Sequence, residues 1–179
     1  MEYLDIVDEN NNLTGEVVER DIVHKEGLCH REVAVWVVNE QGEILVQKRS
    51  ATKKFLANRW GACAGHVSSG DDIENAAKRE LFEEIGLDRE RLEFMFVAKV
   101  EDERNNAVIN NMFQYMYFLK TNTEIADYKI QYEELSEVKY INIEELQRIV
   151  NEKDENYTFA KRKYMPKVIE EIKKRIIKN

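Results

Sequence analysis

Three glutamates, Glu80, Glu83 and Glu84, stand at helical spacing near the middle of the chain. Successive helical residues turn by about 100°, so the three side chains fall within an arc of roughly 100° on one face. Like charges at this spacing weaken a bare helix by a few tenths of a kcal/mol per pair. A cation removes that conflict, and hard divalent ions such as Mg²⁺ prefer oxygen ligands. The glutamates therefore predict a metal-dependent site for phosphate chemistry.

A loop that contains glycine leads into this helix and must position it. The helix is predicted from about Asp72 to Ile85, and Gly86 is well placed to end it as a C-cap. Asp71, with Glu74 three residues later, matches the arrangement of a capping box. The loop and the helix together therefore form one unit that holds the glutamates.

The segment from position 65 to 87 has fixed residue types at fixed spacing, Gly65-x5-Asp71-x7-Arg79-Glu80-Leu81-x-Glu83-Glu84-x-Gly86-Leu87. It closely resembles the Nudix box, Gly-x5-Glu-x7-Arg-Glu-(apolar)-x-Glu-Glu-x-Gly-(apolar), with Asp71 in place of one glutamate. A short Arg-Glu-Leu-x-Glu-Glu stretch is common on solvated helices, but the full register makes a chance match implausible. The resemblance extends over roughly residues 30 to 150.

The resemblance implies hydrolysis of a nucleoside diphosphate derivative or a similar small molecule, with Mg²⁺ or Mn²⁺ as cofactor. The metal would neutralise phosphate charge and lower the pKa of a bound water. One of the glutamates, Glu80 by preference, would orient or deprotonate that water. Arg79 would tie the helix to the loop through Asp71. The implied catalytic residues are Glu80, Glu83, Glu84 and Arg79, and the implied metal ligands are the three glutamates with the backbone at Ala64 and Gly65.

Positively charged residues gather between positions 48 and 54, where they can serve a substrate. The cluster is either a solvated connection or a set of cations for the substrate's diphosphate, since Arg can hold two oxygens at once. The predicted substrate-binding residues are Arg49, Lys54 and His66. Aromatic residues that belong either to the core or to a base-stacking site are Trp36, Trp60, Phe113 and Tyr115. Further candidate acids are Glu101, Glu103, Glu133 and Glu134.

All three histidines, His24, His30 and His66, lie in the first 66 residues. With the basic residues that follow, they also resemble type I isopentenyl-diphosphate isomerase, a relative built on the Nudix fold. Those enzymes use a histidine-rich metal site and a cysteine two residues before the last histidine. Here that position is Ala64, and Cys63 lies one residue too early, which in a strand reverses the direction of the side chain.

Three functions therefore remain open. The first is a diphosphohydrolase, which the intact glutamates favour. The second is an isopentenyl-diphosphate isomerase, against which Ala64 counts. The third is a Nudix-fold binding module without turnover, although such modules usually lose box glutamates. The histidines and Cys63 either bind a metal such as Zn²⁺ or are simply histidines near a cleft with a small buried cysteine.

The pattern of apolar residues predicts an α/β fold, a mixed α/β sandwich with an N-terminal β-hairpin, and the resemblance implies an α/β/α sandwich of the Nudix type with a mixed sheet. Strands alternate with turns through the middle of the chain, and Glu32 to Val38 is typical of a strand covered on both faces. Residues 1–179 are expected to form a single domain. Its expected parts are an N-terminal hairpin at 1–29, a core at about 30–150 and a C-terminal helix at about 158–177.

Composition restricts the partners. A net charge of −8 argues against general binding to nucleic acid, so the expected partner is a small diphosphate, with a homodimer possible. Two cysteines are too few for a disulfide framework, and the acidic start lacks the features of a signal peptide. No stretch approaches the roughly 20 apolar residues that span a bilayer. These features predict a cytoplasmic protein without membrane contact.

Overall fold

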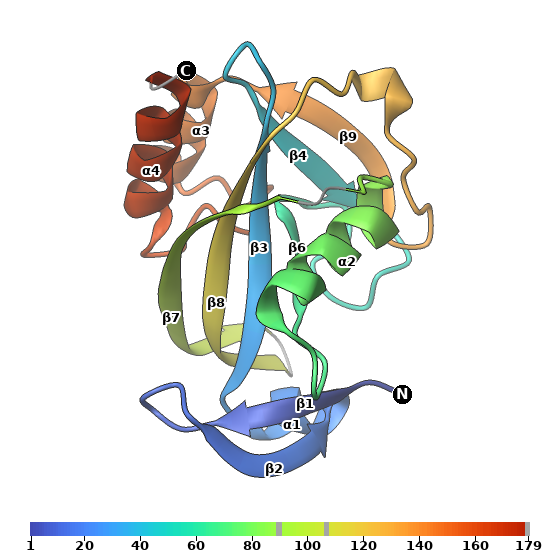
Figure 1. Ribbon diagram of the computed structural model, residues 1–179, viewed down its shortest axis with the longest axis vertical. Helices are drawn as coiled ribbons and strands as arrows, with labels where there is room; N and C mark the ends of the chain where they lie inside the picture. Colours follow the sequence, from blue (N-terminus) through green and yellow to red (C-terminus); the bar gives the residue numbers. More distant parts are fainter. Residues whose placement is uncertain (89–90, 106–107, 178–179) are drawn as a thin grey trace.

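The computed structural model describes residues 1–88, 91–105 and 108–177, and for residues 102–105 and 108 it describes the backbone. Strands alternate with four α-helices and one short 3₁₀ helix, η1 (Figure 1). The strands are β1 (Tyr3–Val7), β2 (Leu13–Glu19), β3 (His30–Val38), β4 (Ile44–Arg49), β5 (Trp60–Gly61), β6 (Cys63–His66), β7 (Glu93–Asn105), β8 (Val108–Lys120) and β9 (Leu135–Ile141). The helices are α1 (Arg20–Glu26), α2 (Ile73–Ile85), η1 (Ile125–Asp127), α3 (Ile143–Glu152) and α4 (Met165–Ile177).

The main sheet is mixed, as the sequence predicts. Its strand order is β5-β4-β3-β8-β7, while β6 also pairs with β3 and β9 pairs with β4. The central pair β3 and β8 is parallel, and the other pairs are antiparallel. β3 therefore has neighbours on both sides and forms the axis of the molecule.

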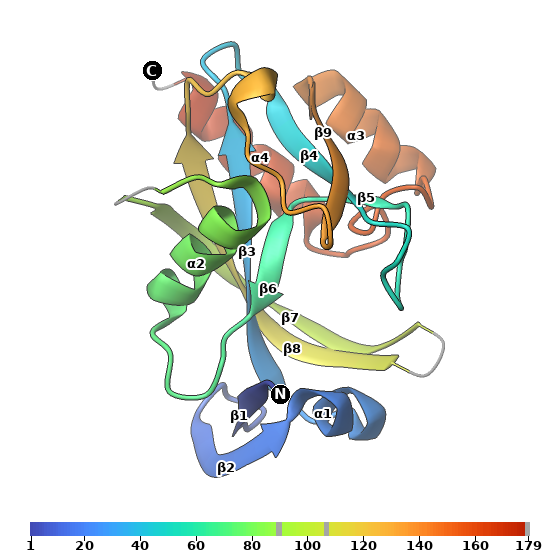
Figure 2. The same ribbon diagram turned by 90° about the vertical axis from the view of Figure 1, so that its right-hand side faces the viewer.

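Helices cover both faces of this sheet, with α2 on one face and α3 and α4 on the other (Figures 1 and 2). Alternate residues of β3 point to opposite faces, so Val33 and Val35 pack with α2, while Ala34 and Trp36 pack with α3 and α4. The predicted α/β/α sandwich and the strand covered on both faces are thus confirmed.

The N-terminal hairpin is also confirmed, as a separate two-stranded sheet of β1 and β2. The sequence analysis did not predict α1, which follows the hairpin directly. Its buried Val23 packs with Leu4 and Ile6 of β1, and its end at Gly27 takes a left-handed conformation with φ of 70°. A helix of seven residues is too short for a periodic pattern to reveal it.

The C-terminal helix begins later than predicted, at Met165 instead of about position 158. Residues 158–164 form turns instead, and the Thr158 N–H donates to the Trp60 carbonyl. Pro166 in the first turn suits a helix start, because its missing N–H would be unpaired there. The apolar stripe of α4 is buried as expected, through Val168, Ile169 and Ile172.

The start of α2 corrects a second prediction, because the N-cap is Asp72 and not Asp71. The carboxylate of Asp72 accepts hydrogen bonds from the N–H groups of Glu74 and Asn75. Asp71 instead lies 3.7 Å from Arg79. Gly86 ends the helix in a left-handed conformation with φ of 71°, as predicted.

Strands β3 and β4 diverge after one paired position, Val38 with Ile44. Beyond that point β6 pairs with β3, and β5 and β9 pair with β4. The separation is visible in Figure 2, and it opens the sheet at its centre.

Among the residues described, each helix is too short or too polar to cross a bilayer.

Removal of the α2 N-cap provides a test of this local structure. Asp72→Ala should lower the free energy of unfolding by about 1 kcal/mol, because two helix N–H groups lose their acceptor. Asp71→Ala is the matched control and should cost less, since its ion pair with Arg79 is long and half exposed. Denaturant titration of both variants measures the difference. Equal losses would contradict the assignment of the cap.

Candidate active site

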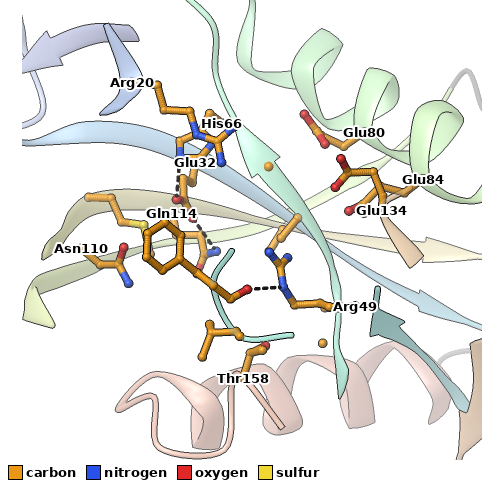
Figure 3. Close-up of a pocket in the computed structure, with 18 of the residues that line it drawn as sticks. Arg20, Glu32, Arg49, His66, Glu80, Glu84, Asn110, Gln114, Glu134 and Thr158 are labelled. Atoms are coloured by element: carbon orange, nitrogen blue, oxygen red, sulfur yellow. Dashed lines mark hydrogen bonds and ion pairs between the residues drawn. The ribbon is translucent and has the colours of Figure 1, made fainter. Parts of the chain in front are cut away.

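A cavity of about 1070 Å³ lies where β3 and β4 diverge. It is lined from both faces of the sheet, by α2, β3, β4, β6 and β8 and by the segment before α4 (Figure 3). The cavity brings together the residues predicted to be catalytic, metal-binding or substrate-binding side chains, with Gly65: Arg49, Lys54, Gly65, His66, Arg79, Glu80, Glu83 and Glu84. Their roles stay predictions, but their proximity is a property of the fold.

Glu80, Glu83 and Glu84 of α2 differ in their surroundings. Glu84 is 6% exposed, and its carboxylate accepts a 2.6 Å hydrogen bond from the amide of Gln47 on β4. Only 13% of the Glu80 side chain is exposed, whereas half of the Glu83 side chain faces solvent at the rim. Figure 3 shows Glu80, Glu84 and Glu134 grouped on one side of the cavity. Glu134, one of the further acids considered, is ion-paired with Lys53.

The two inner carboxyls are electrostatically disfavoured as free anions. Burial, together with the charge of Glu84, raises the pKa of Glu80 to about 7. Burial likewise raises the pKa of Glu84, although Gln47 acts in the opposite direction. A cation among these oxygens would remove both penalties, so the donor set fits a hard divalent metal.

Gly65 allows α2 to approach β6 closely. A Cβ atom at this position would lie 2.1 Å from the carboxyl carbon of Glu80. Glycine matters here because of space and not because of a left-handed backbone, since a larger residue would displace the Glu80 carboxylate from this position. The backbone of β6 at Gly65 is therefore in direct contact with the carboxylate of Glu80.

Arg79 joins the helix to the loop. It donates to the carbonyl of His66 at 3.1 Å and to Glu80 at 2.7 Å, and its ion pair with Asp71 is longer, at 3.7 Å. The predicted link through Asp71 is therefore present but is not the shortest one. The His66 carbonyl is a contact that sequence patterns do not reveal.

His24, His30 and His66 come together although they are far apart in the sequence. Their candidate ligand atoms lie within 4.8 Å of one another, and Nε2 of His24 is 2.9 Å from Nε2 of His66. Burial lowers the pKa of His66 to about 3 and also lowers that of His24. Neutral imidazoles are the form that binds transition metals, so this cluster can hold a metal ion.

Glu32 adjoins the histidine cluster, and the sequence analysis did not select it. One of its oxygens lies 3.3 Å from Nε2 of His66 and 3.7 Å from Nε2 of His30. Burial raises the pKa of Glu32, but the two histidines outweigh this effect and lower it to about 2. The available sequence signal was a polar residue within a mainly apolar strand, which Glu32 shares with Gln47 and Gln114.

Cys63 is buried on the α2 side of the sheet, where its thiol hydrogen-bonds with Glu84 and burial raises its pKa. Ala64 lines the cavity instead. The inference that a shift of one residue reverses the side chain is therefore confirmed. The cysteine contacts an acid of α2 and does not face the histidines.

The basic residues divide between the cavity and the surface. Arg49, Lys53 and Lys54 line the cavity, and Arg49 also donates to the carbonyl of Phe55 at 3.3 Å. Lys48 pairs with Glu137 and does not belong to the lining. Of the four aromatic candidates for base stacking, Trp36 alone is among the lining residues.

Comparison with known proteins now decides the family. Residues 29–167 match the model of the NUDIX domain, which is most of the chain. The chain belongs to the Nudix family. The Nudix chain described here is thus an enzyme of hydrolase or isomerase-like type.

Individual relatives include both types of enzyme. The chain is 32% identical over 163 residues to isopentenyl-diphosphate delta-isomerase 2 of Photorhabdus laumondii, covering 88% of this chain and 86% of that protein. It is also 32% identical over 157 residues to an uncharacterised Nudix hydrolase of Clostridium acetobutylicum, covering 85% and 75% respectively. The crystal structure of DR0079 from Deinococcus radiodurans superposes with a TM-score of 0.66 at 21% identity, covering 84% of this chain and 90% of that one, and supports the fold alone.

The raised pKa of Glu80 predicts a pH dependence of stability in the metal-free protein. The folded-state pKa of about 7 exceeds the ordinary value of 4.5, so the unfolded chain releases its proton first. Stability should therefore fall as pH rises from about 4.5 to 7. Thermal unfolding in EDTA across this range measures the fall, which Glu80→Gln should reduce more than Glu83→Gln at the exposed rim. An equal slope in both variants would contradict the burial effect.

Proposed function

We propose that this Nudix chain is a divalent-metal-dependent hydrolase that cleaves a diphosphate linkage. The observation that carries the proposal is a pair of carboxylates, the buried Glu84 and the partly buried Glu80, facing a cavity that also holds basic side chains. Bound Mg²⁺ or Mn²⁺ would neutralise phosphate charge and activate water. Glu80, Glu83 and Glu84 would hold it, with the loop backbone at Gly65.

The remaining residues act on the substrate or on the acids. Arg49 and Lys54 are placed to bind the diphosphate oxygens, and Arg can do so with two parallel hydrogen bonds. Gln47 holds the carboxylate of Glu84 in one orientation. Glu80 would also orient or deprotonate the attacking water, because its carboxylate lies beside that of Glu84 in the cavity.

A second candidate is an isomerase acting on isopentenyl diphosphate. It is supported by the histidine cluster with Glu32 in the same cavity and by the 32% identity to an isomerase. Two observations weigh against it. The Ala64 side chain, which lines the cavity, has no acidic group. The Cys63 thiol lies on the α2 face of the sheet, opposite to the face of Ala64.

The hydrolase proposal predicts a large effect at Glu84. Glu84→Gln should lower kcat/KM by at least about 100-fold, or ~2.7 kcal/mol of transition-state stabilisation, because a metal-binding oxygen is lost. Glu74→Gln is the matched control, since Glu74 lies on the same helix but pairs with Lys78 at the surface. Phosphate release measures both. Full activity of Glu84→Gln would refute the role.

The substrate panel should include nucleoside diphosphate sugars, dinucleoside polyphosphates, nucleotide cofactors, oxidised nucleotides and isopentenyl diphosphate, each with Mg²⁺ and with Mn²⁺. A hydrolase releases phosphate or a nucleotide from at least one of them. An isomerase converts isopentenyl diphosphate to its allylic isomer without release of phosphate. Isomerisation without hydrolysis of any compound would exchange the first candidate for the second.

A further inference from the structure

A row of polar side chains crosses three strands on the α4 side of the sheet. The strand register pairs Glu32 of β3 directly with His66 of β6 and with Gln114 of β8. Directly paired residues of neighbouring strands point to the same face, so the three side chains lie side by side. Gln114 is 5% exposed, and 14% of the Glu32 side chain is exposed.

Hydrogen bonds fix the orientation of this row. The Tyr164 hydroxyl donates to Oε1 of Gln114 at 2.8 Å, and Nε2 of Gln114 donates to Glu32 at 3.3 Å. The Gln114 amide is therefore held with its oxygen toward the tyrosine and its nitrogen toward the carboxylate. An amide nitrogen carries two N–H groups, and among the residues described Glu32 is the partner of this one. A second N–H can thus reach a ligand.

On the β6 side of β3, small residues separate this row from Trp36, while Met116 of β8 pairs with Ala34 on its other side. Two positions along the strands, Ala34 pairs with Ala64, so the sheet has a shallow floor there. Trp36 follows, 1% exposed, and its indole N–H has no hydrogen-bond partner within the described part of the chain. A buried donor without an acceptor is destabilising. Since Trp36 also lines the cavity, a ligand can supply that acceptor.

The row and the acids lie on opposite sides of one cavity. In Figure 3, Glu32 and Gln114 face the space from one side, Glu80 and Glu84 lie on the other, and Arg49 lies between them. A diphosphate held at the acids and Arg49 would leave space for its attached group over Ala34 and Ala64, beside the row.

We propose that Glu32, Gln114 and Tyr164 form a polar subsite that selects the group attached to the diphosphate. This inference rests on the proposed hydrolase function. The subsite favours a group with polar hydrogen-bonding atoms over a hydrocarbon, because a hydrocarbon would exclude water from the second Gln114 N–H and from the Glu32 carboxylate without offering them a hydrogen bond. Gln114 and Tyr164 are specificity-determining residues that act on binding and not on the chemical step.

The test compares three diphosphate monoesters that differ in their organic group. Ribose 5-diphosphate offers hydroxyls, ADP adds base N–H groups, and isopentenyl diphosphate is a hydrocarbon ester. The wild type should prefer the first two, and the stronger of these identifies hydroxyl or base recognition. Gln114→Leu should raise their KM about tenfold with kcat little changed, and should not raise the KM for isopentenyl diphosphate.

Tyr164→Phe removes one hydroxyl and guards against misfolding of the leucine variant. It should raise the same KM values about threefold. The control is Tyr140→Phe, which also loses a half-buried hydroxyl hydrogen bond but lies outside the cavity lining. A preference of the wild type for isopentenyl diphosphate overturns the proposal, as do equal effects on all three esters or an equal effect of the control.

Calorimetric binding of the three esters to Glu84→Gln with Mg²⁺ separates the subsite from turnover. If Glu84→Gln still binds the two polar esters more tightly than isopentenyl diphosphate, and the wild type hydrolyses none of the three, the hydrolase function is refuted and the subsite is supported. Metal content per chain, measured for the wild type and Gln114→Leu, addresses the histidine cluster. A loss of bound metal in the variant would show that the row supports that cluster and would overturn the subsite.

Discussion

The contact between α2 and β6 is the constraint on which the acidic side of the cavity depends. The Glu80 carboxylate lies where a side chain at position 65 would stand, so any residue larger than glycine would push this carboxylate out of its place. Arg79 then fixes the helix to the loop carbonyl of His66. With the helix this close, Glu80 and Glu84 are buried facing the cavity, and burial raises both pKa values. The contact of the Glu80 carboxylate with the β6 backbone and the raised pKa values of Glu80 and Glu84 thus have one cause, the close packing of α2 on β6.

The divergence of β3 and β4 has an equally wide effect. The two strands pair at Val38 and Ile44, next to the turn, and separate with increasing distance from it. The cavity therefore reaches both faces of the sheet. The acids of α2 enter it from one face, and His66, Glu32 and Gln114 enter it from the other. One substrate can then contact groups from opposite layers, which a continuous sheet would keep apart.

The Nudix framework here combines features of two kinds of enzyme. The glutamates of α2 have the arrangement of a hydrolase, while the histidine cluster and the 32% identity to an isomerase point to the other kind. The direction of side chains on β6 separates the two. Ala64 faces the cavity and Cys63 faces Glu84, so the cavity lacks a thiol at that position. The choice between the two chemistries therefore depends on the alternation of a four-residue strand.

The sequence by itself determined the family, the sandwich and the group of acids, because spacing along a helix and alternation along a strand are local properties. It also indicated the opposite directions of Cys63 and Ala64. Other features depended on the tertiary structure. Two helix boundaries belong here, because Asp71 and Asp72 can each cap α2, and the apolar pattern before Met165 is also compatible with an earlier start of α4. The gathering of the histidines and the alignment of Glu32 with Gln114 depend on which strands become neighbours, and no pattern within one segment records that pairing.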